Sequence, residues 1–247
     1  MNSDSATWRP AWPDELPLAG DAHVWRARLD RPEPEVDALS ALLAPDEQAR
    51  ASRFHFDRDR RDFIVARGLL RLLIGHYLGC VPAEPAFVYG PQGKPALRPD
   101  TGLHFNVAHS SGVALFAFAV DGPLGVDVEC IRPVEHEALA ERFFSQAECA
   151  ALEHVPADHR HEAFFTVWTR KEAYIKALGG GLSVPLDQFD VSVEAAADTS
   201  LVVERKPGAT MPWIVHNIDA GPEFRGALAV DKPQVRVHLS GVPGCWV

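Results

Sequence analysis

Two alternating carboxylates form the most chemically suggestive short segment of the sequence. Residues 125–129 read Gly-Val-Asp-Val-Glu, and the alternation of valines with Asp127 and Glu129 is typical of a strand. In a strand both carboxylates lie on one face, with Cα atoms roughly 6.5–7 Å apart. Their charges repel at that separation, and a divalent cation would hold them together. Oxygen ligands of this kind suit magnesium or manganese, and a solvated pair on an edge strand is the alternative.

A third carboxylate and a lysine lie on the helix predicted over residues 164–178. Glu172 and Lys176 are one helical turn apart, on the flank of the apolar side of that helix. The glycines at 179–181 are expected to end the helix, because glycine tolerates the left-handed geometry of a helix C-terminus. The pair is either a surface ion pair or, if this helix packs across residues 125–129, part of the same cation site.

Two further side chains are suited to contacting a phosphate. Lys94 lies in the glycine- and proline-rich turn at residues 90–95, which is expected to lift it out of the fold. His109 follows the strand predicted over residues 103–107. An ammonium and an imidazole are both suitable phosphate ligands, although a solvated turn lysine and a hydrogen-bonded structural histidine are the alternatives.

Basic residues concentrate in one segment of an acidic chain. The whole sequence has a net charge of −10, which argues against general nucleic-acid binding. Residues 50–71, in contrast, contain seven arginines and three aspartates, a local net charge of +4. This segment indicates a small phosphorylated ligand or an acidic partner, unless it is simply a solvated helix face.

Composition sets the class of protein. The chain has 247 residues, of which 47% are hydrophobic and 23% charged, as is usual for a globular protein with one large or two small domains. No apolar run is long enough to span a membrane and no signal region precedes the first strand, so we expect a cytoplasmic protein without membrane contact. The four cysteines form no Cys-x-x-Cys pair, and neither a zinc site nor a disulfide framework is indicated.

The predicted elements mix helices and strands in both halves of the chain. Tight-turn residues 121–123 are the best boundary, and no residue-level repeat between the halves is visible. The mixture favours an α+β fold with antiparallel sheets. Helices are predicted at 35–43, from 45, at 62–78, 145–152 and 164–178, with a loop at 157–160. Strands are predicted at 23–29, 87–89, 103–107, 113–120, 125–129, 189–193, 201–204, 212–218, 224–230 and 235–239.

Five short stretches, in order, resemble the 4′-phosphopantetheinyl transferases, specifically the larger monomeric, Sfp-like type. The stretches are Gly93–Pro95, Phe105–Ser110, Gly125–Glu129, Arg142–Ser145 and Trp168–Lys176. The resemblance implies two similar α/β halves with antiparallel sheets, residues 1–122 and 123–247, in a pseudo-twofold (pseudodimer) arrangement. Coenzyme A would lie in the cleft between them, its nucleotide on the first half. The second half would hold the metal site and dock the carrier protein.

The resemblance also implies roles for individual residues. Asp127, Glu129 and Glu172 would be the ligands of Mg²⁺, or of Mn²⁺ in its place, and Lys176 would contact the pyrophosphate of coenzyme A. Residues expected to hold the nucleotide are Lys94, His109 and Ser110, with Arg50 and Arg67 added from the basic segment and Asp127 from the metal site. Ala108 is a departure, because many relatives have serine there and one hydroxyl contact would be missing.

The implied reaction transfers phosphopantetheine from coenzyme A to a serine of an apo acyl or peptidyl carrier protein and releases 3′,5′-ADP. Glu172 is the candidate base, directly or through a water held by the ion, and Lys176 would stabilise charge on the pyrophosphate. Leu178 and Leu182 are expected to dock the carrier. The alternatives are another magnesium-dependent enzyme that transfers or hydrolyses phosphate groups, and a non-catalytic module that only binds carrier proteins.

Overall fold

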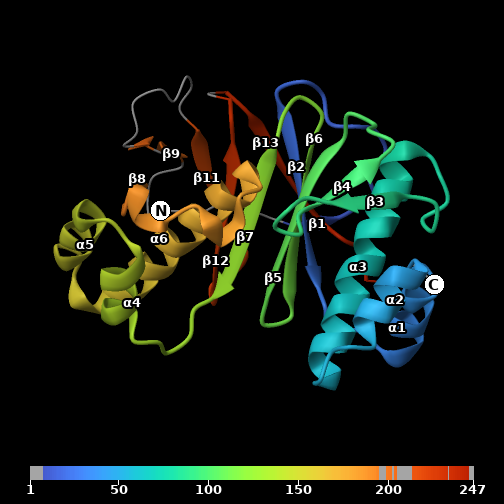
Figure 1. The fold of residues 1–247 in the computed structure, drawn as a ribbon, viewed down its shortest axis with the longest axis horizontal. Coiled ribbons are helices and arrows are strands. Elements are labelled where there is room, and N and C mark those ends of the chain that lie inside the picture. Colours follow the sequence, from blue (N-terminus) through green and yellow to red (C-terminus); the bar gives the residue numbers. More distant parts are fainter. Residues whose placement is uncertain (1–7, 195–198, 202, 205–212, 233, 245–247) are drawn as a thin grey trace.

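The computed structural model describes residues 8–194, 199–201, 203–204, 213–232 and 234–244. Two β-sheets pack against each other, and one long helix covers the outer face of each (Figure 1). The predicted α+β class is therefore confirmed. No helix in the described part of the chain is long and apolar enough to cross a membrane.

The first sheet combines the N-terminal strands with the last strand of the chain. Its order is β1 (Arg9–Pro10), β13 (Arg236–Gly241), β2 (Asp21–Arg28), β6 (Val113–Ala119) and β5 (His104–Ser110). Strands β2, β6 and β5 pair antiparallel as predicted, but β13 pairs parallel to β2 and to β1. Because β13 completes this sheet, a division into residues 1–122 and 123–247 does not keep the first sheet within one segment.

The second sheet is antiparallel throughout. Its order is β7 (Leu124–Cys130), β12 (Phe224–Val230), β11 (Ile214–Ile218) and β9 (Thr199–Leu201). Two small ladders lie outside the main sheets: β3 (Ala86–Tyr89) with β4 (Pro95–Arg98), and β8 (Phe189–Asp190) with β10 (Val203–Glu204). Edge strand β7 carries the two carboxylates that the sequence placed together.

The helices follow the same order in both halves. Helices α1 (Glu33–Ser40), α2 (Pro45–Ala51) and α3 (Asp57–Leu78) belong to the first half, and α4 (His136–Phe143), α5 (Gln146–Glu153) and α6 (Ala157–Leu178) to the second. Two 3₁₀ turns, η1 (Gly181–Ser183) and η2 (Leu186–Gln188), follow α6. Both α3 and α6 have 22 residues and end at a left-handed glycine, Gly79 and Gly179. The loop predicted at 157–160 is wrong, because those residues form the first turn of α6.

Three apolar clusters hold these layers together. Leu73 of α3 packs with Phe116 of β6, and Phe164 of α6 belongs to the cluster beneath the second sheet. Between the sheets, Leu115 packs with Val126 and its neighbours, so successive residues of β6 face opposite layers. This explains why residues 113–119 are apolar without alternation: both faces of β6 are buried.

Strands β5 and β7 lie side by side where the two sheets meet (Figure 1). Side chains of β5 bridge them: the Val126 N–H donates to Asn106 Oδ1 at 2.8 Å, and the Cys130 N–H donates to Ser110 Oγ at 3.2 Å. Both bridges join residues twenty positions apart, so the two strands run in the same direction. Their C-terminal ends, with His109 and Glu129, therefore come to the same edge of the molecule.

Candidate active site

Asp127 is the most deeply buried carboxylate of the site, with 4% of its surface exposed. Its Oδ1 atom accepts a hydrogen bond from Lys176 Nζ at 2.6 Å. Its Oδ2 atom is buried and has no hydrogen-bond partner among the described residues. A solvated pair on an edge strand is thereby excluded for Asp127, and an unpartnered buried carboxylate oxygen is costly unless a cation or donor joins it.

A glycine allows helix α6 to reach this strand. A Cβ atom at Gly125 would lie 2.1 Å from the carbonyl oxygen of Ala173 and 2.4 Å from the backbone nitrogen of Ala177. Only a residue without a side chain lets the two backbones approach so closely. The contact lays α6 across β7, which is the packing that the sequence required for Glu172 and Lys176 to reach Asp127.

Glu172 shares its surroundings with both carboxylates of β7. Burial, followed by the nearby charge of Asp127, raises the pKa of Glu172 to about 6, with Lys176 opposing the shift and Glu129 adding to it. Burial also raises the pKa of Asp127, against the charge and the hydrogen bond of Lys176. The surface ion pair between Glu172 and Lys176 is therefore an incomplete description, because Lys176 bonds to Asp127.

These three carboxylates suit a magnesium ion by the chemistry of their donors. They offer only oxygen atoms, their negative charges interact, and Asp127 Oδ2 lacks a partner in the described structure. Among the described residues, however, no three or more His, Cys, Asp or Glu side chains lie in an arrangement that could hold a metal ion as they stand. Lys176 partly neutralises Asp127 in this arrangement.

Ser110 orients the carboxylate at the end of β7. Its hydroxyl donates to Glu129 Oε2 at 2.8 Å, and Arg132 Nη1 lies 3.2 Å from the same oxygen. The sequence assigned Ser110 to the nucleotide, whereas in this structure it contacts Glu129. The predicted nucleotide contact of Ser110 remains a prediction.

Three of the residues expected to hold a nucleotide line one cavity of about 200 Å³: Arg50, Arg67 and His109. A second cavity of about 410 Å³ adjoins it, because His109 and Phe63 line both. Burial lowers the pKa of His109, with Asp62 as the largest opposing charge, which favours the neutral imidazole. The guanidinium groups of Arg50 and Arg67 therefore supply the positive charge of the first cavity.

Lys94 does not point away from the fold as the turn predicted. Its Nζ atom donates to the carbonyl oxygens of Leu124 at 2.9 Å, Lys176 at 2.7 Å and Ala177 at 3.2 Å. These three bonds use all the hydrogens of an ammonium group, and burial lowers the pKa of Lys94 to about 8. In this structure Lys94 caps the C-terminal end of α6 and ties it to the β3–β4 turn. A phosphate contact by Lys94 would displace one of these carbonyls.

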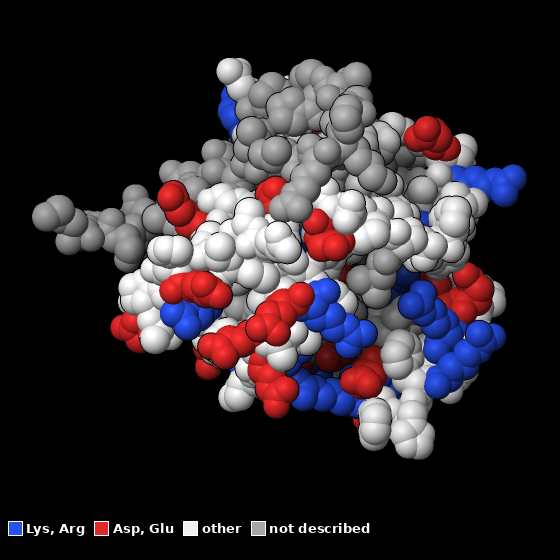
Figure 2. All heavy atoms as spheres, turned by 60° about the vertical axis from the view of Figure 1, so that its left-hand side comes forward, with Lys and Arg blue, Asp and Glu red and all other residues white. Residues whose placement is uncertain are grey.

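The seven arginines of residues 50–71 have different roles. Arg60 and Arg61 pair with Asp57 and Glu33 on the surface of α3, as the solvated-face alternative proposed. Arg71, in contrast, is 1% exposed inside the first half. On one face of the molecule, acidic and basic side chains are interspersed (Figure 2).

Comparison with known proteins identifies the family. Residues 30–120 match the model of the 4′-phosphopantetheinyl transferase N-terminal region, and residues 123–227 match that of the 4′-phosphopantetheinyl transferase superfamily. The 4′-phosphopantetheinyl transferase HetI of Nostoc sp. is 40% identical over 191 residues, which cover 76% of this chain and 80% of HetI. The chain belongs to the 4′-phosphopantetheinyl transferase superfamily.

Two further transferases are similar to this superfamily member over most of their length. The 4′-phosphopantetheinyl transferase psf-1 of Bacillus pumilus is 32% identical over 206 residues, 83% of this chain and 86% of psf-1. The 4′-phosphopantetheinyl transferase Sfp of Bacillus subtilis is 28% identical over 212 residues, 85% of this chain and 92% of Sfp. The Sfp-like type expected from the five short stretches is therefore confirmed.

Residues that support the candidate site were missed in the sequence. Asn106 bridges the two strands, Gly125 admits α6, and Glu47 pairs with two arginines, of which Arg67 lines the cavity. Asn106 and Gly125 lie inside the stretches that carry the resemblance, which was the available signal. Glu47 had no such signal, because its partners are twenty and twenty-four positions away.

Proposed function

We propose that the protein transfers 4′-phosphopantetheine from coenzyme A to a serine of an apo acyl or peptidyl carrier protein. The observation that supports this most is the convergence of Asp127, Glu172 and Lys176 beside a cavity lined by Arg50 and Arg67. Paired carboxylates suit a magnesium-bound pyrophosphate, and arginines suit the nucleotide phosphates. Similarity to named transferases over most of the chain agrees with this reaction.

Each residue of the site has a separate role in the proposed reaction. Asp127, Glu129 and Glu172 would hold magnesium or manganese, and the ion would neutralise charge on the pyrophosphate. A Glu172 oxygen accepts the proton of the carrier serine hydroxyl as the serine oxygen bonds to the β-phosphorus. The bond between that phosphorus and the bridging oxygen breaks, and its electron pair leaves on 3′,5′-ADP. Lys176 stabilises the charge that develops there.

Coenzyme A would bind across the junction of the two halves. Its nucleotide end meets Arg50, Arg67 and His109 on the first half, and its pyrophosphate meets the carboxylates of the second. A pseudo-twofold relation of two similar halves is supported by the equal lengths of α3 and α6. We place the protein in the cytoplasm as a monomer, where coenzyme A and carrier proteins meet.

The carrier would dock beside the end of α6. Leu178 is 42% exposed there, immediately before the left-handed Gly179. An exposed apolar side chain next to a flexible turn suits docking of a partner surface. The side chain of Leu182, the other residue expected at this surface, lies outside the described structure.

The test is the mass of an apo carrier protein after incubation with the purified protein, coenzyme A and magnesium. We expect the carrier to gain the mass of one phosphopantetheine group, and a carrier whose acceptor serine is alanine to gain nothing. Excess EDTA should abolish the gain and added magnesium should restore it. A carrier that binds without gaining mass would favour the non-catalytic module, and full transfer in EDTA would contradict the metal assignment.

A further inference from the structure

A buried carboxylate in the first half holds two arginines of α3. Glu47, near the start of α2, is 2% exposed. Its Oε2 atom accepts from Arg71 Nε at 2.7 Å and from the Ala44 N–H at 2.9 Å. Its Oε1 atom lies 3.5 Å from Arg67 Nε, an ion-pair contact, and has no hydrogen-bond partner among the described residues. Arg71 also donates to the carbonyl oxygens of residues 82, 83 and 85. Arg71 is therefore held by several bonds, whereas Glu47 provides the ion pair of Arg67.

Arg67 has a free donor beside the nucleotide cavity. Its side chain is 10% exposed and lines that cavity. The guanidinium carbon lies 5.8 Å from the ring centre of Phe63 and 5.2 Å from that of Phe87. Its Nη1 atom is buried and has no hydrogen-bond partner among the described residues. A buried, charged donor without a partner is costly in the free protein, and an anion entering the cavity would relieve that cost.

The second half contains the same arrangement without the free arginine. Glu148 near the start of α5 is 2% exposed and accepts from Lys171 Nζ at 2.8 Å. Lys171 also donates to carbonyl oxygens that follow its helix, as Arg71 does. Arg71 and Lys171 both lie fourteen residues after the first residue of a 22-residue helix. The residue of α6 that corresponds to Arg67 is Val167, which is fully buried.

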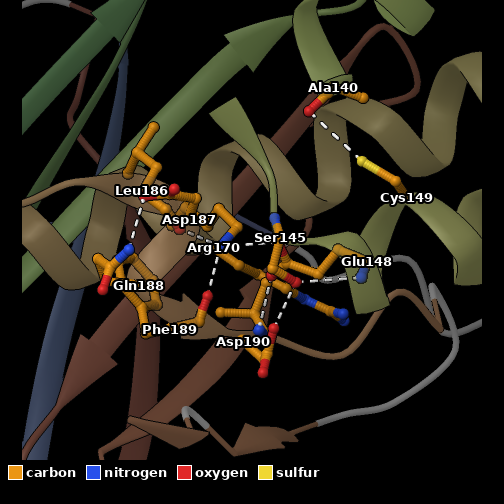
Figure 3. Close-up of polar contacts among 12 residues, drawn as sticks. Ala140, Ser145, Glu148, Cys149, Arg170, Leu186, Asp187, Gln188, Phe189 and Asp190 are labelled. Atoms are coloured by element: carbon orange, nitrogen blue, oxygen red, sulfur yellow. Dashed lines mark hydrogen bonds and ion pairs between the residues drawn. The ribbon is translucent and has the colours of Figure 1, made fainter. Parts of the chain in front are cut away.

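The contacts of Glu148 indicate what such a carboxylate does by itself. Ser145 caps α5 beside Glu148, and the Ser145 hydroxyl bonds to Asp190 (Figure 3). The second oxygen of Glu148 accepts from the Val191 N–H at 2.8 Å. Glu148 thus joins α5, α6 and the chain that follows them, with no cavity-lining arginine. This makes it a structural counterpart of Glu47 within the same molecule.

We propose that Glu47 is a positioning residue for nucleotide binding: it fixes Arg67 so that its free guanidinium donor serves a phosphate of coenzyme A. The proposal rests on the proposed function, because it assigns the cavity to the nucleotide. Glu47 does not touch the substrate. It acts through Arg67, so replacing Glu47 weakens nucleotide binding only while Arg67 is present.

The test compares Glu47→Gln, Arg67→Gln and the double variant. The glutamine at 47 keeps an acceptor for Arg71 and for the backbone of α2, so the fold is expected to persist. The probe is 3′,5′-ADP without metal, and its dissociation constant is measured by calorimetry. We expect each single change to raise that constant roughly tenfold to a hundredfold, the effect of one lost charged hydrogen bond. The double variant should resemble Arg67→Gln alone.

Kinetics and a matched control separate positioning from folding. In transfer assays, Glu47→Gln should raise the KM for coenzyme A while kcat at saturating coenzyme A stays within about twofold. Glu148→Gln removes the equivalent buried charge from the second half. It should lower the melting temperature but leave the 3′,5′-ADP constant within about twofold, because distant sites act independently.

Several outcomes would overturn the proposal. One is that Glu47→Gln binds 3′,5′-ADP with the parental dissociation constant. Another is that the increases of this constant in the two single variants multiply in the double variant. A third is that Glu148→Gln raises the constant as much as Glu47→Gln does. If Glu47→Gln does not fold, parental binding by Arg67→Gln alone has the same meaning. A parent that binds no 3′,5′-ADP and transfers nothing would contradict the proposed function itself. A parent that transfers while Glu47→Gln binds normally contradicts only the role of Glu47.

Discussion

Glu172 is the residue at which the two interpretations of the site differ most. As a member of a surface ion pair it would contribute only about 0.3–0.5 kcal/mol to the free energy of unfolding. In the structure, however, burial and then the charges of Asp127 and Glu129 raise its pKa, and Lys176 bonds to Asp127. The position of Glu172 therefore agrees with a role as metal ligand and base.

Replacing Glu172 by glutamine tests that role. The change keeps the shape of the side chain but removes the charge that an ion needs and the ability to accept a proton. We expect the transfer rate to fall by at least about two orders of magnitude, with the fold retained. Melting with and without magnesium is the companion measurement: the ion should stabilise the parent and have much less effect on the variant. A folded variant with a near-parental transfer rate would contradict the role of Glu172 as metal ligand and base and would favour a surface ion pair.

The raised pKa of Glu172 predicts a pH dependence in the metal-free protein. Its pKa rises from the ordinary 4.5 to about 6 on folding. A group whose folded pKa is raised contributes its stability fully below pH 4.5 and loses it as the pH rises through about 6. In EDTA, the melting temperature of the parent should therefore fall over this range relative to that of Glu172→Gln. Parallel curves for the two proteins would contradict the shift.

For single residues, the sequence predicted which side chains belong to the candidate site better than it predicted the atoms that they contact. It singled out Asp127, Glu172 and Lys176 from their spacing, and the structure brings them together. It did not predict that Lys94 would cap α6, because the carbonyl oxygens that Lys94 contacts belong to a distant helix end and to the start of β7. Such bonds depend on tertiary packing, which residue spacing along one element does not contain.

The crossing of α6 over β7 is the contact between elements on which the site depends. Gly125 makes it possible, because any Cβ there would overlap the backbone of α6. The sequence placed the glycine beside the carboxylates but gave no indication of its purpose. The sequence also predicted too late a start for α6, at residue 164, because residues 157–160 are polar and histidine-rich yet helical.

Gly125→Ala should separate these two elements. The new methyl group would lie 2.1 Å from the Ala173 carbonyl oxygen, so α6 must shift. We expect a loss of about 3 kcal/mol in the free energy of unfolding, measured with urea, and a fall in kcat. Gly90→Ala is the matched control, because its nearest neighbour would be 3.6 Å away; it should stay within about 0.5 kcal/mol. Equal stability of the two variants would contradict the close packing.

In the whole molecule, strands from the beginning and from the end of the chain belong to the same sheet. Strand β13 returns to the first sheet and pairs with β2, so the final segment of the sequence completes the sheet of the first half. The alternating pattern predicted a strand there but could not identify its partner, because pairing is set by burial and not by local propensity. The correspondence between α3 and α6 was equally hidden: the two helices share length and a buried cation position, but few residues.

The amount of 3′,5′-ADP released for each carrier molecule modified distinguishes phosphopantetheine transfer from hydrolysis of coenzyme A. Both products are measured in one reaction that contains coenzyme A, magnesium and an apo carrier, the nucleotide by chromatography and the carrier by intact mass. Transfer across the junction of the halves predicts equal amounts of 3′,5′-ADP and holo-carrier, rising together with time. Release of 3′,5′-ADP with an unmodified carrier would mean hydrolysis, and the absence of both products would mean that no phosphopantetheine is transferred; either result would contradict the proposed reaction.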